Sequence, residues 1–353
     1  MPGLLDPLTD LSPGAVASGP PGRRRIDLFF TVPEIGRMGS ANLWHRRWTE
    51  GAGWEPAGWY RRGGSWTSAT LATAFSGGRV DLFGLGVDGG LWHTWGLGNG
   101  LDRRGEWERR SLGSPRDWTI VTSPAPIALG PARLLVAVRA RHTGGAHGLW
   151  FASLEGGTEI TPPRWRWVRR LAEGWPTAQR TFATALGIAS RRPGALDLFT
   201  ATTNFELVHS WLDGDTTSPW GGFGNRRPEG GLTSSPSAAV WQSDTASSVH
   251  VVACYGPFLA GPGTDPGRVE LKSWLGRHWT PQSPIYTGGR TDGRWVVGPP
   301  AVVSWGKPRL DVFFLSAANP VTNEDAGITH GWSDGGAHRG GWRWDVLPLP
   351  RLT

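Results

Sequence analysis

The stretch Arg79-Val80-Asp81-Leu82-Phe83 recurs along the chain and decides the fold. Close copies are Arg25-Ile-Asp-Leu-Phe29, Ala195-Leu-Asp-Leu-Phe199 and Arg309-Leu-Asp-Val-Phe313, and weaker copies are Arg133-Leu-Leu-Val-Ala137 and Ser248-Val-His-Val-Val252. The third residues of the six copies stand at positions 27, 81, 135, 197, 250 and 311, so one copy occurs every 53 to 62 residues. A repeat of this length that fills a chain indicates a modular fold, in which each unit buries its apolar faces against its neighbours.

Each copy lies at the same place in a longer unit. A segment of small residues precedes it, as in Gly298-Pro-Pro-Ala-Val-Val-Ser-Trp305, and an aromatic segment follows it, as in Gly90-Leu-Trp-His-Thr-Trp95. Turn sequences such as Asp88-Gly89-Gly90 separate the segments, because glycine adopts the positive φ that tight hairpins need. Four short strands in each of six units are typical of a propeller blade. The sequence therefore predicts an all-β fold, a six-bladed β-propeller with four antiparallel strands per blade.

We expect a single propeller domain over residues 1–353. The predicted blades span roughly residues 12–60, 66–113, 118–172, 181–224, 232–281 and 296–348. Two longer segments, 255–267 and 315–326, are rich in Gly, Pro, Asn and Asp, which predicts loops that extend from the ring.

Composition excludes several other classes of protein. The chain has 53 Gly and 29 Pro among 353 residues, which argues against a helical bundle, and the glycines lack the three-residue period of collagen. Its 23 Trp residues argue against disorder. Cys254 is the single cysteine, so the sequence allows no internal disulfide.

The sequence also limits the expected location and partners. The first ten residues contain neither a basic segment nor an apolar run, so we expect cytoplasmic synthesis without a signal peptide, with any release by a non-classical route. No apolar run is long enough to span a membrane. The net charge of +7 is spread along the chain, and we expect no nucleic acid partner. The sequence leaves oligomerisation open.

Most of the tryptophans have a structural explanation, because indoles fill the widening space between blades. In Arg164-Trp-Arg-Trp-Val-Arg-Arg170, for example, alternation places Trp165 and Trp167 on one face and the arginines on the other. The repeated Asp27, Asp81, Asp197 and Asp311 are also expected to be structural, as acceptors of backbone or indole N–H groups. A catalytic pair of carboxylates would not recur in every blade.

The Leu-Trp-His-x-Trp motif of the third strand has two interpretations. An indole beside an imidazole suits a sugar ring, which stacks on the indole while its hydroxyls find hydrogen-bond partners. The same pair could instead be buried packing, with the histidine bonded to a backbone carbonyl. No nucleophile elbow, phosphate loop, dinucleotide fingerprint or metal-ligand spacing occurs, so we predict no catalytic residue, no metal and no cofactor.

The repeat resembles that of bacterial propeller lectins typified by the Photorhabdus fucose-binding lectin, and more distantly that of six-bladed fungal fucose lectins. The resemblance covers nearly the whole chain. It implies a non-catalytic disc with shallow sites between adjacent blades that take fucose or O-methylated sugars. The sugar-binding residues that it implies here are Trp44, His45, Trp48, Trp92, His93, Trp95, His209, Trp211, His330 and Trp332.

Departures from the family pattern leave other functions open. The Photorhabdus type has seven blades, whereas this chain shows six longer units. Val208 and Thr329 replace the first Trp of the motif, and the third and fifth units lack its His. The first alternative is a protein-interaction or structural adaptor propeller in a larger assembly. The second is an enzyme whose site lies at the mouth of the channel.

Overall fold

The computed structural model describes most of the chain as strands and tight turns. The described residues are 12–20, 22–33, 40–56, 58–74, 79–96, 107–130, 133–155, 164–169, 182, 184–223, 231–242, 247–256, 267–289, 293–305, 309–318, 325–334 and 341–350. The loop segments 257–266 and 319–324, within the two longer loops expected from sequence, lie outside these residues, whereas Leu315–Ala317 end a strand.

In the described part of the chain, twenty-eight strands form six antiparallel sheets, and each sheet is one blade. Blade 1 contains β1 (Gly14–Ser18), β2 (Arg25–Pro33), β3 (Ala41–Thr49), β4 (Gly53–Trp54) and β5 (Tyr60–Trp66). Blade 2 contains β6 (Leu71–Ala74), β7 (Val80–Leu85), β8 (Leu91–Gly96) and β9 (Glu108–Gly113). Blade 3 contains β10 (Trp118–Ile120), β11 (Ala125–Gly130), β12 (Arg133–His142), β13 (His147–Glu155) and β14 (Arg164–Arg169).

The second half of the chain repeats this arrangement. Blade 4 contains β15 (Gly187–Arg192), β16 (Ala195–Ala201), β17 (Leu207–Asp213), β18 (Thr216–Thr217) and β19 (Gly221–Gly222). Blade 5 contains β20 (Ser237–Gln242), β21 (Ser247–Tyr255), β22 (Arg268–Trp274) and β23 (Ser283–Thr287). Blade 6 contains β24 (Trp295–Val296), β25 (Ala301–Ser304), β26 (Leu310–Ala317), β27 (Gly327–Ser333) and β28 (Arg343–Pro348).

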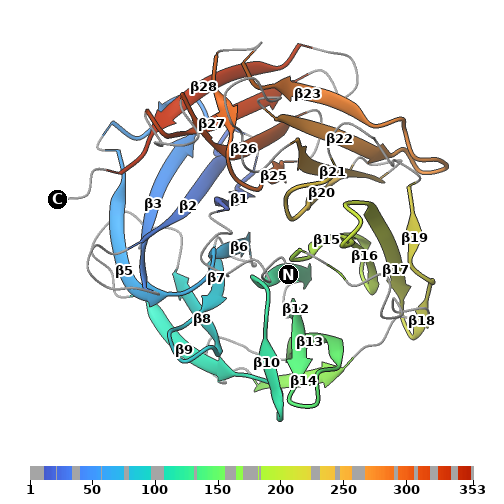
Figure 1. Cartoon of the computed structure of the whole chain (residues 1–353). Helices are drawn as coiled ribbons and strands as arrows, with labels where there is room; N and C mark the ends of the chain where they lie inside the picture. The colour runs from blue at the N-terminus through green and yellow to red at the C-terminus, as the bar shows by residue number, and fades with distance from the viewer. Residues whose placement is uncertain are drawn as a thin grey trace.

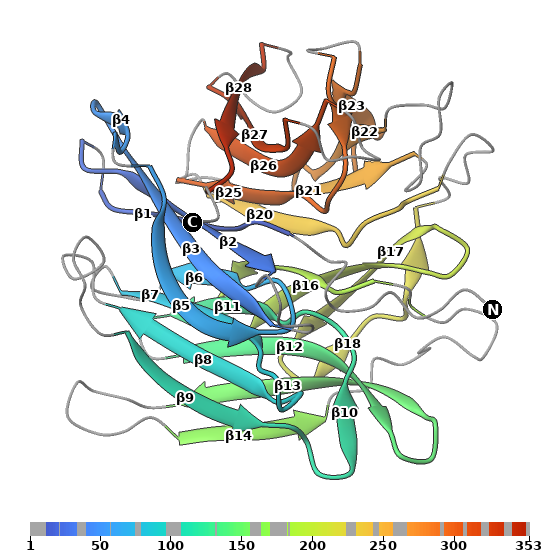
Figure 2. The same cartoon turned by 60° about the vertical axis from the view of Figure 1, so that its left-hand side comes forward.

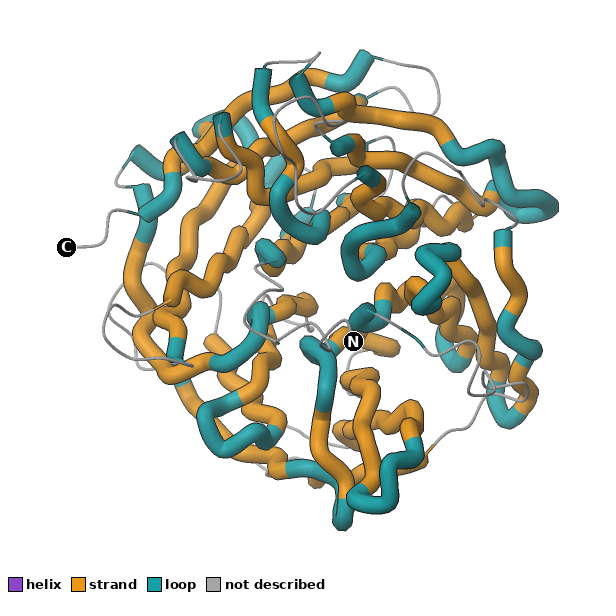
Figure 3. Tube along the Cα trace, in the orientation of Figure 1, coloured by secondary structure: helices purple, strands orange, loops and turns teal. Residues whose placement is uncertain are grey.

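The six sheets stand around a central axis and form a six-bladed β-propeller (Figure 1). The innermost long strands β1, β6, β11, β15, β20 and β25 each contact the next, and β25 contacts β1, so the ring is closed. Figure 2 shows the blades from the side, and Figure 3 shows that strands joined by loops make up the described chain. The predicted fold class is confirmed.

The repeated Asp motif forms the second strand of its blade, counted from the axis. β7 and β26 are buried along their whole lengths, because both faces of the sheet are covered by neighbouring blades. A hydroxyl residue just before the inner strand accepts a backbone N–H of the second strand, as Ser68 Oγ does from Leu85 N at 2.9 Å. Thr122, Thr184 and Ser234 repeat this bond in blades 3, 4 and 5, so one local device fixes the position of the second strand in successive blades.

Side chains close the ring between blade 6 and blade 1. Within the described ranges each sheet is built from one continuous part of the chain, so these two blades exchange no strand there. Trp59 Nε1 instead donates to the carbonyl of Pro348 at 2.7 Å, and Trp48 stacks on Trp305 with ring centroids 5.0 Å apart. The contacts that join the first and last blades are therefore of the kind that join the others.

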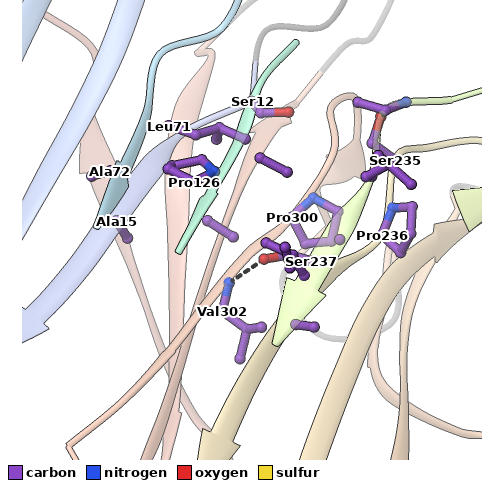
Figure 4. Close-up of a pocket in the computed structure, with 17 residues that line it drawn as sticks. Ser12, Ala15, Leu71, Ala72, Pro126, Ser235, Pro236, Ser237, Pro300 and Val302 are labelled. Carbon is purple, nitrogen blue, oxygen red and sulfur yellow. Dashed lines mark hydrogen bonds between the residues drawn. The ribbon is translucent and has the colours of Figure 1, made fainter. Parts of the chain in front are cut away.

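The inner strands leave a small cavity of about 100 Å³ on the axis. Its lining includes Ala15, Pro126 and Val302, and Ser237 Oγ accepts the Val302 N–H at 3.1 Å (Figure 4). The lining residues are small, apolar or hydroxyl-bearing, and none of those that the structure describes there is titratable. This cavity offers no group for general acid–base catalysis.

Two further searches of the described residues bear on function. No helical segment among them has the length and apolar character that a membrane span requires. Nor do three or more His, Cys, Asp or Glu side chains gather among them as metal ligands.

Candidate functional site

A buried column of side chains fills the face that most blades turn toward the next blade. In blade 2, Asp81 accepts a hydrogen bond from His93 Nε2 at 2.7 Å and pairs with Arg79 at 2.6 Å. Blades 1, 4 and 6 repeat the His–Asp bond at 2.9, 2.9 and 2.8 Å. The carboxylates are therefore structural, as expected, but imidazole and guanidinium donors take the place of the predicted backbone and indole groups.

Aromatic rings hold each imidazole in place. His93 stacks on Phe83 with centroids 4.5 Å apart and on Trp95 with centroids 4.6 Å apart. Trp165 of blade 3 meets the edge of the same imidazole at 5.4 Å, which confirms the predicted core role of this tryptophan. Trp54 and Trp279 make the equivalent contacts to the histidines of blades 6 and 4. Each such Trp comes from the outer part of the following blade and locks two blades together.

The pKa values of three of these histidines shift in different directions because their surroundings differ. Burial lowers the pKa of His45 and of His93 more than the hydrogen bonds that these imidazoles donate to Asp27 and Asp81 raise it. Burial also disfavours charge on His330, but Asp311 at Nε2 and Asp345, 3.1 Å from Nδ1, outweigh it and raise the pKa of His330. Burial alone would raise the pKa of Asp27, yet His45 and two arginines hold it below its usual value.

The predicted Trp–His platforms are divided between two faces of the sheet. Successive side chains of a strand point to opposite faces, so His93 faces blade 3 while Trp92 packs with the cluster between blades 1 and 2. His45, His93 and His330 are buried, and His209 keeps 15% of its side chain exposed. A sugar cannot reach a fully buried histidine and the indole beside it at the same time. Whether these residues bind sugar stays a prediction.

The register also separates Trp48 from its expected equivalents. Trp95, Trp211 and Trp332 stand opposite the repeated Asp, whereas Arg47 takes that place in blade 1 and donates to Asp27 at 2.9 Å. Trp48 lies one residue later and faces blade 6. Trp44, two positions before Arg46 on that same face, is half-buried and pairs with Arg61 of the outer strand β5.

Two of the predicted tryptophans, Trp48 and Trp332, meet at the junction between blades 6 and 1. The Arg309 guanidinium is fixed by Asp311 through two hydrogen bonds of 2.8 and 2.9 Å. It lies 5.0 Å from the ring centroid of Trp48, 4.6 Å from that of Trp305 and 5.8 Å from that of Trp332. All three indoles are half-buried, so this Trp–Arg cluster combines apolar ring surface with oriented N–H donors.

A second Trp–Arg cluster occurs at the junction between blades 4 and 5. Arg191 is held by Asp197 through bonds of 2.6 and 3.0 Å and lies 5.9 Å from the ring centroid of Trp274 in blade 5. Trp211 stands opposite Asp197 on the adjacent strand. Both clusters lie at the edge of the sheet where the inner strand turns into the second strand, so they share one rim of the disc.

Sequence reasoning missed four members of these clusters. Arg309 was visible as the residue that opens the repeated motif, but Arg191 comes from the inner strand β15, outside the motif. Trp274 ends β22 in the unit after that of Arg191, so no pattern within one unit pairs these two residues, and Trp305 directly follows β25 in the same unit as Arg309. Blades 3 and 5 lack the column altogether, because Leu135 and His250 replace the aspartate.

Comparisons with known proteins point to one fold. No family model and no curated protein sequence matches the chain. A fucose-specific lectin from Aleuria aurantia aligns with a TM-score of 0.61 and 16% identity over 96% of this chain and 95% of that one. The protein AofleA from Arthrobotrys oligospora aligns with a TM-score of 0.60 and 13% identity over 98% of this chain and 88% of that one. A lectin from Burkholderia pseudomallei aligns with a TM-score of 0.54 and 18% identity over 97% of this chain and 86% of that one. At these identities the comparisons establish that the chain shares the architecture of propeller lectins.

Proposed function

We propose that the protein is a carbohydrate-binding propeller that holds fucose or O-methylated sugars in shallow sites between blades and does not catalyse a reaction. The two Trp–Arg clusters, at Arg309 and Arg191, carry this proposal. Indole faces accept the apolar C–H side of a sugar, and an arginine fixed by a carboxylate presents N–H donors to hydroxyl oxygens. The methyl group of fucose or of an O-methyl substituent adds apolar surface for the indoles.

The likeness to fucose-specific lectins supports this proposal at the level of the fold. The finer assignment to the Photorhabdus type rests on the repeat sequence. Among the described residues, an arginine that is hydrogen-bonded to an aspartate lies over a tryptophan of the next blade at two junctions of this ring, from blade 4 to blade 5 and from blade 6 to blade 1. We therefore propose two sugar sites per chain, fewer than the number of blades.

Calorimetry with methyl α-L-fucoside tests the proposal, after a glycan array has ranked fucosylated and methylated ligands. We expect two sites in the wild type and one each in Trp48→Ala and Trp274→Ala, because each substitution removes the apolar platform of one cluster. Loss of the stacked ring surface should weaken that site about tenfold or more. The double variant should bind no sugar while its circular dichroism spectrum stays unchanged.

Trp92→Ala is the matched comparison. Trp92 is also half-buried beneath an arginine, with Arg109 4.4 Å from its ring centroid, but it lies near Asp88 at the opposite rim. We expect this variant to keep both sites. Loss of binding in Trp92→Ala with retention in the other two variants would move the sites to that rim. A wild type that binds no sugar at millimolar concentration rejects the proposal and favours the adaptor alternative.

A further inference from the structure

The face that blade 3 turns toward blade 4 carries arginines in place of the Asp–His column. Arg133, Arg139 and Arg141 alternate along β12 and therefore share this face. His147 stands directly opposite Arg141 on β13, and the same face of β14 carries the exposed Arg166. Positive charge is thus concentrated at the junction between blades 3 and 4.

Arg139 is a buried cation. Its side chain belongs to a residue that is 4% exposed, and the corresponding positions of the other blades hold neutral residues: Thr31, Leu85, Ala201, Cys254 and Leu315. Arg139 Nη1 donates to the carbonyl of Phe182, which pairs with Thr202 of blade 4, so the guanidinium crosses the junction. Its Nε is buried without a hydrogen-bond partner.

No carboxylate among the described residues lies within ion-pair distance of Arg139. Burial lowers the pKa of this guanidinium to about 10, and no neighbouring negative charge opposes the effect. An arginine stays charged at this pKa, so its charge is buried uncompensated. Such a charge is strongly unfavourable unless an anion approaches it.

His147 lies within the influence of these arginines. Its burial first, and then the charges of Arg139 and Arg141, lower the pKa of this imidazole. His147 Nδ1 is buried and has no hydrogen-bond partner. Arg139 Nε and His147 Nδ1 are therefore two unused polar atoms on one face, beside the exposed Arg141 at the end of the sheet.

We propose that the junction between blades 3 and 4 binds an oxyanion, the carboxylate or sulfate group of a ligand, through Arg139, Arg141 and His147. A guanidinium offers a planar pair of donors that matches two oxygens of such a group. Protonation of His147 as the anion enters adds a third contact. The site is separate from the Trp–Arg clusters, and it gives the protein a second binding specificity, for acidic groups.

Thermal denaturation in sodium sulfate, sodium acetate and sodium chloride of equal ionic strength tests this proposal. We expect a saturable rise in Tm with the preferred oxyanion above the chloride baseline, because an anion that binds only the native state stabilises it. Sulfate and acetate serve as separate arms that distinguish a sulfated ligand from a carboxylated one. Arg139→Met keeps the length of the side chain without its charge, and should weaken anion binding about tenfold or more.

Arg116→Met is the control, since Arg116 is 96% exposed in the same blade and its substitution removes the same charge. It should respond to the anions as the wild type does. A second measurement needs no variant: an NMR titration of His147 should show its pKa rising when the bound oxyanion offsets the charges of the arginines. The proposal fails if neither the Tm nor the His147 titration responds to either anion. It also fails if Arg139→Met responds like the wild type.

Discussion

The buried aspartate of the repeat shows how much one residue contributes to a blade. Asp81 is inaccessible and accepts bonds from His93 and Arg79. Asp81→Ala should lower the free energy of unfolding by about 3–5 kcal/mol, because it leaves buried donors without an acceptor. Urea denaturation measures this loss.

Blade 3 supplies the control for this prediction. It holds Leu135 at the aspartate position and Phe151 at the histidine position, and both pack in the core. Asp81→Leu combined with His93→Phe should therefore lose less stability than Asp81→Ala alone. An equal or larger loss in the double variant would mean that the column stabilises the blade through more than satisfied polar groups.

His330 predicts a pH dependence that His45 and His93 do not share. Its raised pKa means that the native state holds the proton more tightly than the unfolded chain. The resulting stabilisation is fully present below pH 6.5, the ordinary value, and is lost as the pH rises through the folded pKa. Asp345→Asn should lower the free energy of unfolding by on the order of 1 kcal/mol at pH 6, a modest loss because Asp345 is 40% exposed to solvent. The loss should be much smaller at alkaline pH, where His330 is neutral.

The difference in unfolding free energy between the wild type and Asp345→Asn separates the contribution of His330 from those of His45 and His93. His45 and His93 have lowered pKa values, so they favour unfolding at acid pH, and they do so equally in both proteins. Unfolding experiments from pH 5.5 to 8.5 would measure the difference. If it stays constant across this range, the Asp345 carboxylate does not influence the charge of His330.

At the scale of the element, three blades join their second and third strands by the same turn. Gly89, Gly145 and Phe205 occupy one position in it, with φ of 71°, 87° and 60°, and each N–H donates to the carbonyl three residues earlier. A bulky residue costs about 1–2 kcal/mol in this left-handed region. Phe205→Asn should therefore stabilise the protein by about 1 kcal/mol in urea denaturation, because Asn tolerates this conformation.

Gly145→Ala provides the reverse experiment. A Cβ at Gly145 would meet no atom within 4 Å. The free energy of unfolding of Gly145→Ala should therefore fall by about 1 kcal/mol through backbone strain alone. If Phe205→Asn destabilises the protein instead, the packing of Phe205 against Gly231 outweighs the strain of its backbone.

The sequence predicts a strand well where its signal lies within one unit and recurs in the other units. The second strand is found by its Asp motif in four blades, because burial on both faces forces an apolar run around a single paired carboxylate. The same reasoning misaligned blade 1, where two arginines between His45 and Trp48 shift the last indole by one residue. Only the pairing of β2 with β3 shows that Arg47 replaces the expected tryptophan, and a one-residue shift changes the face.

At the scale of the whole molecule, the candidate sites lie between units, and this is why the sequence revealed only some of their members. Arg309 and Trp48 are separated by most of the chain and meet only because the ring closes. Arg139 reaches Phe182 across the junction between blades 3 and 4 in a similar way. A sequence repeat predicts which residues each blade contains. The residue pairs at a junction depend on which two blades are neighbours, because the copies of the repeat differ in sequence.

The placement of both Trp–Arg clusters on one rim leads to a prediction about the intact disc. A surface that carries many sugars can engage both sites of one molecule, so the second contact forms at a high effective concentration. Dissociation of the wild type from a fucosylated surface, followed by surface plasmon resonance, should be about 100-fold slower than that of Trp48→Ala or Trp274→Ala. The affinity of the remaining site for free methyl α-L-fucoside should stay unchanged in each variant. Equal dissociation rates for wild type and single variants would place the two sites too far apart, or on faces too different, to act together.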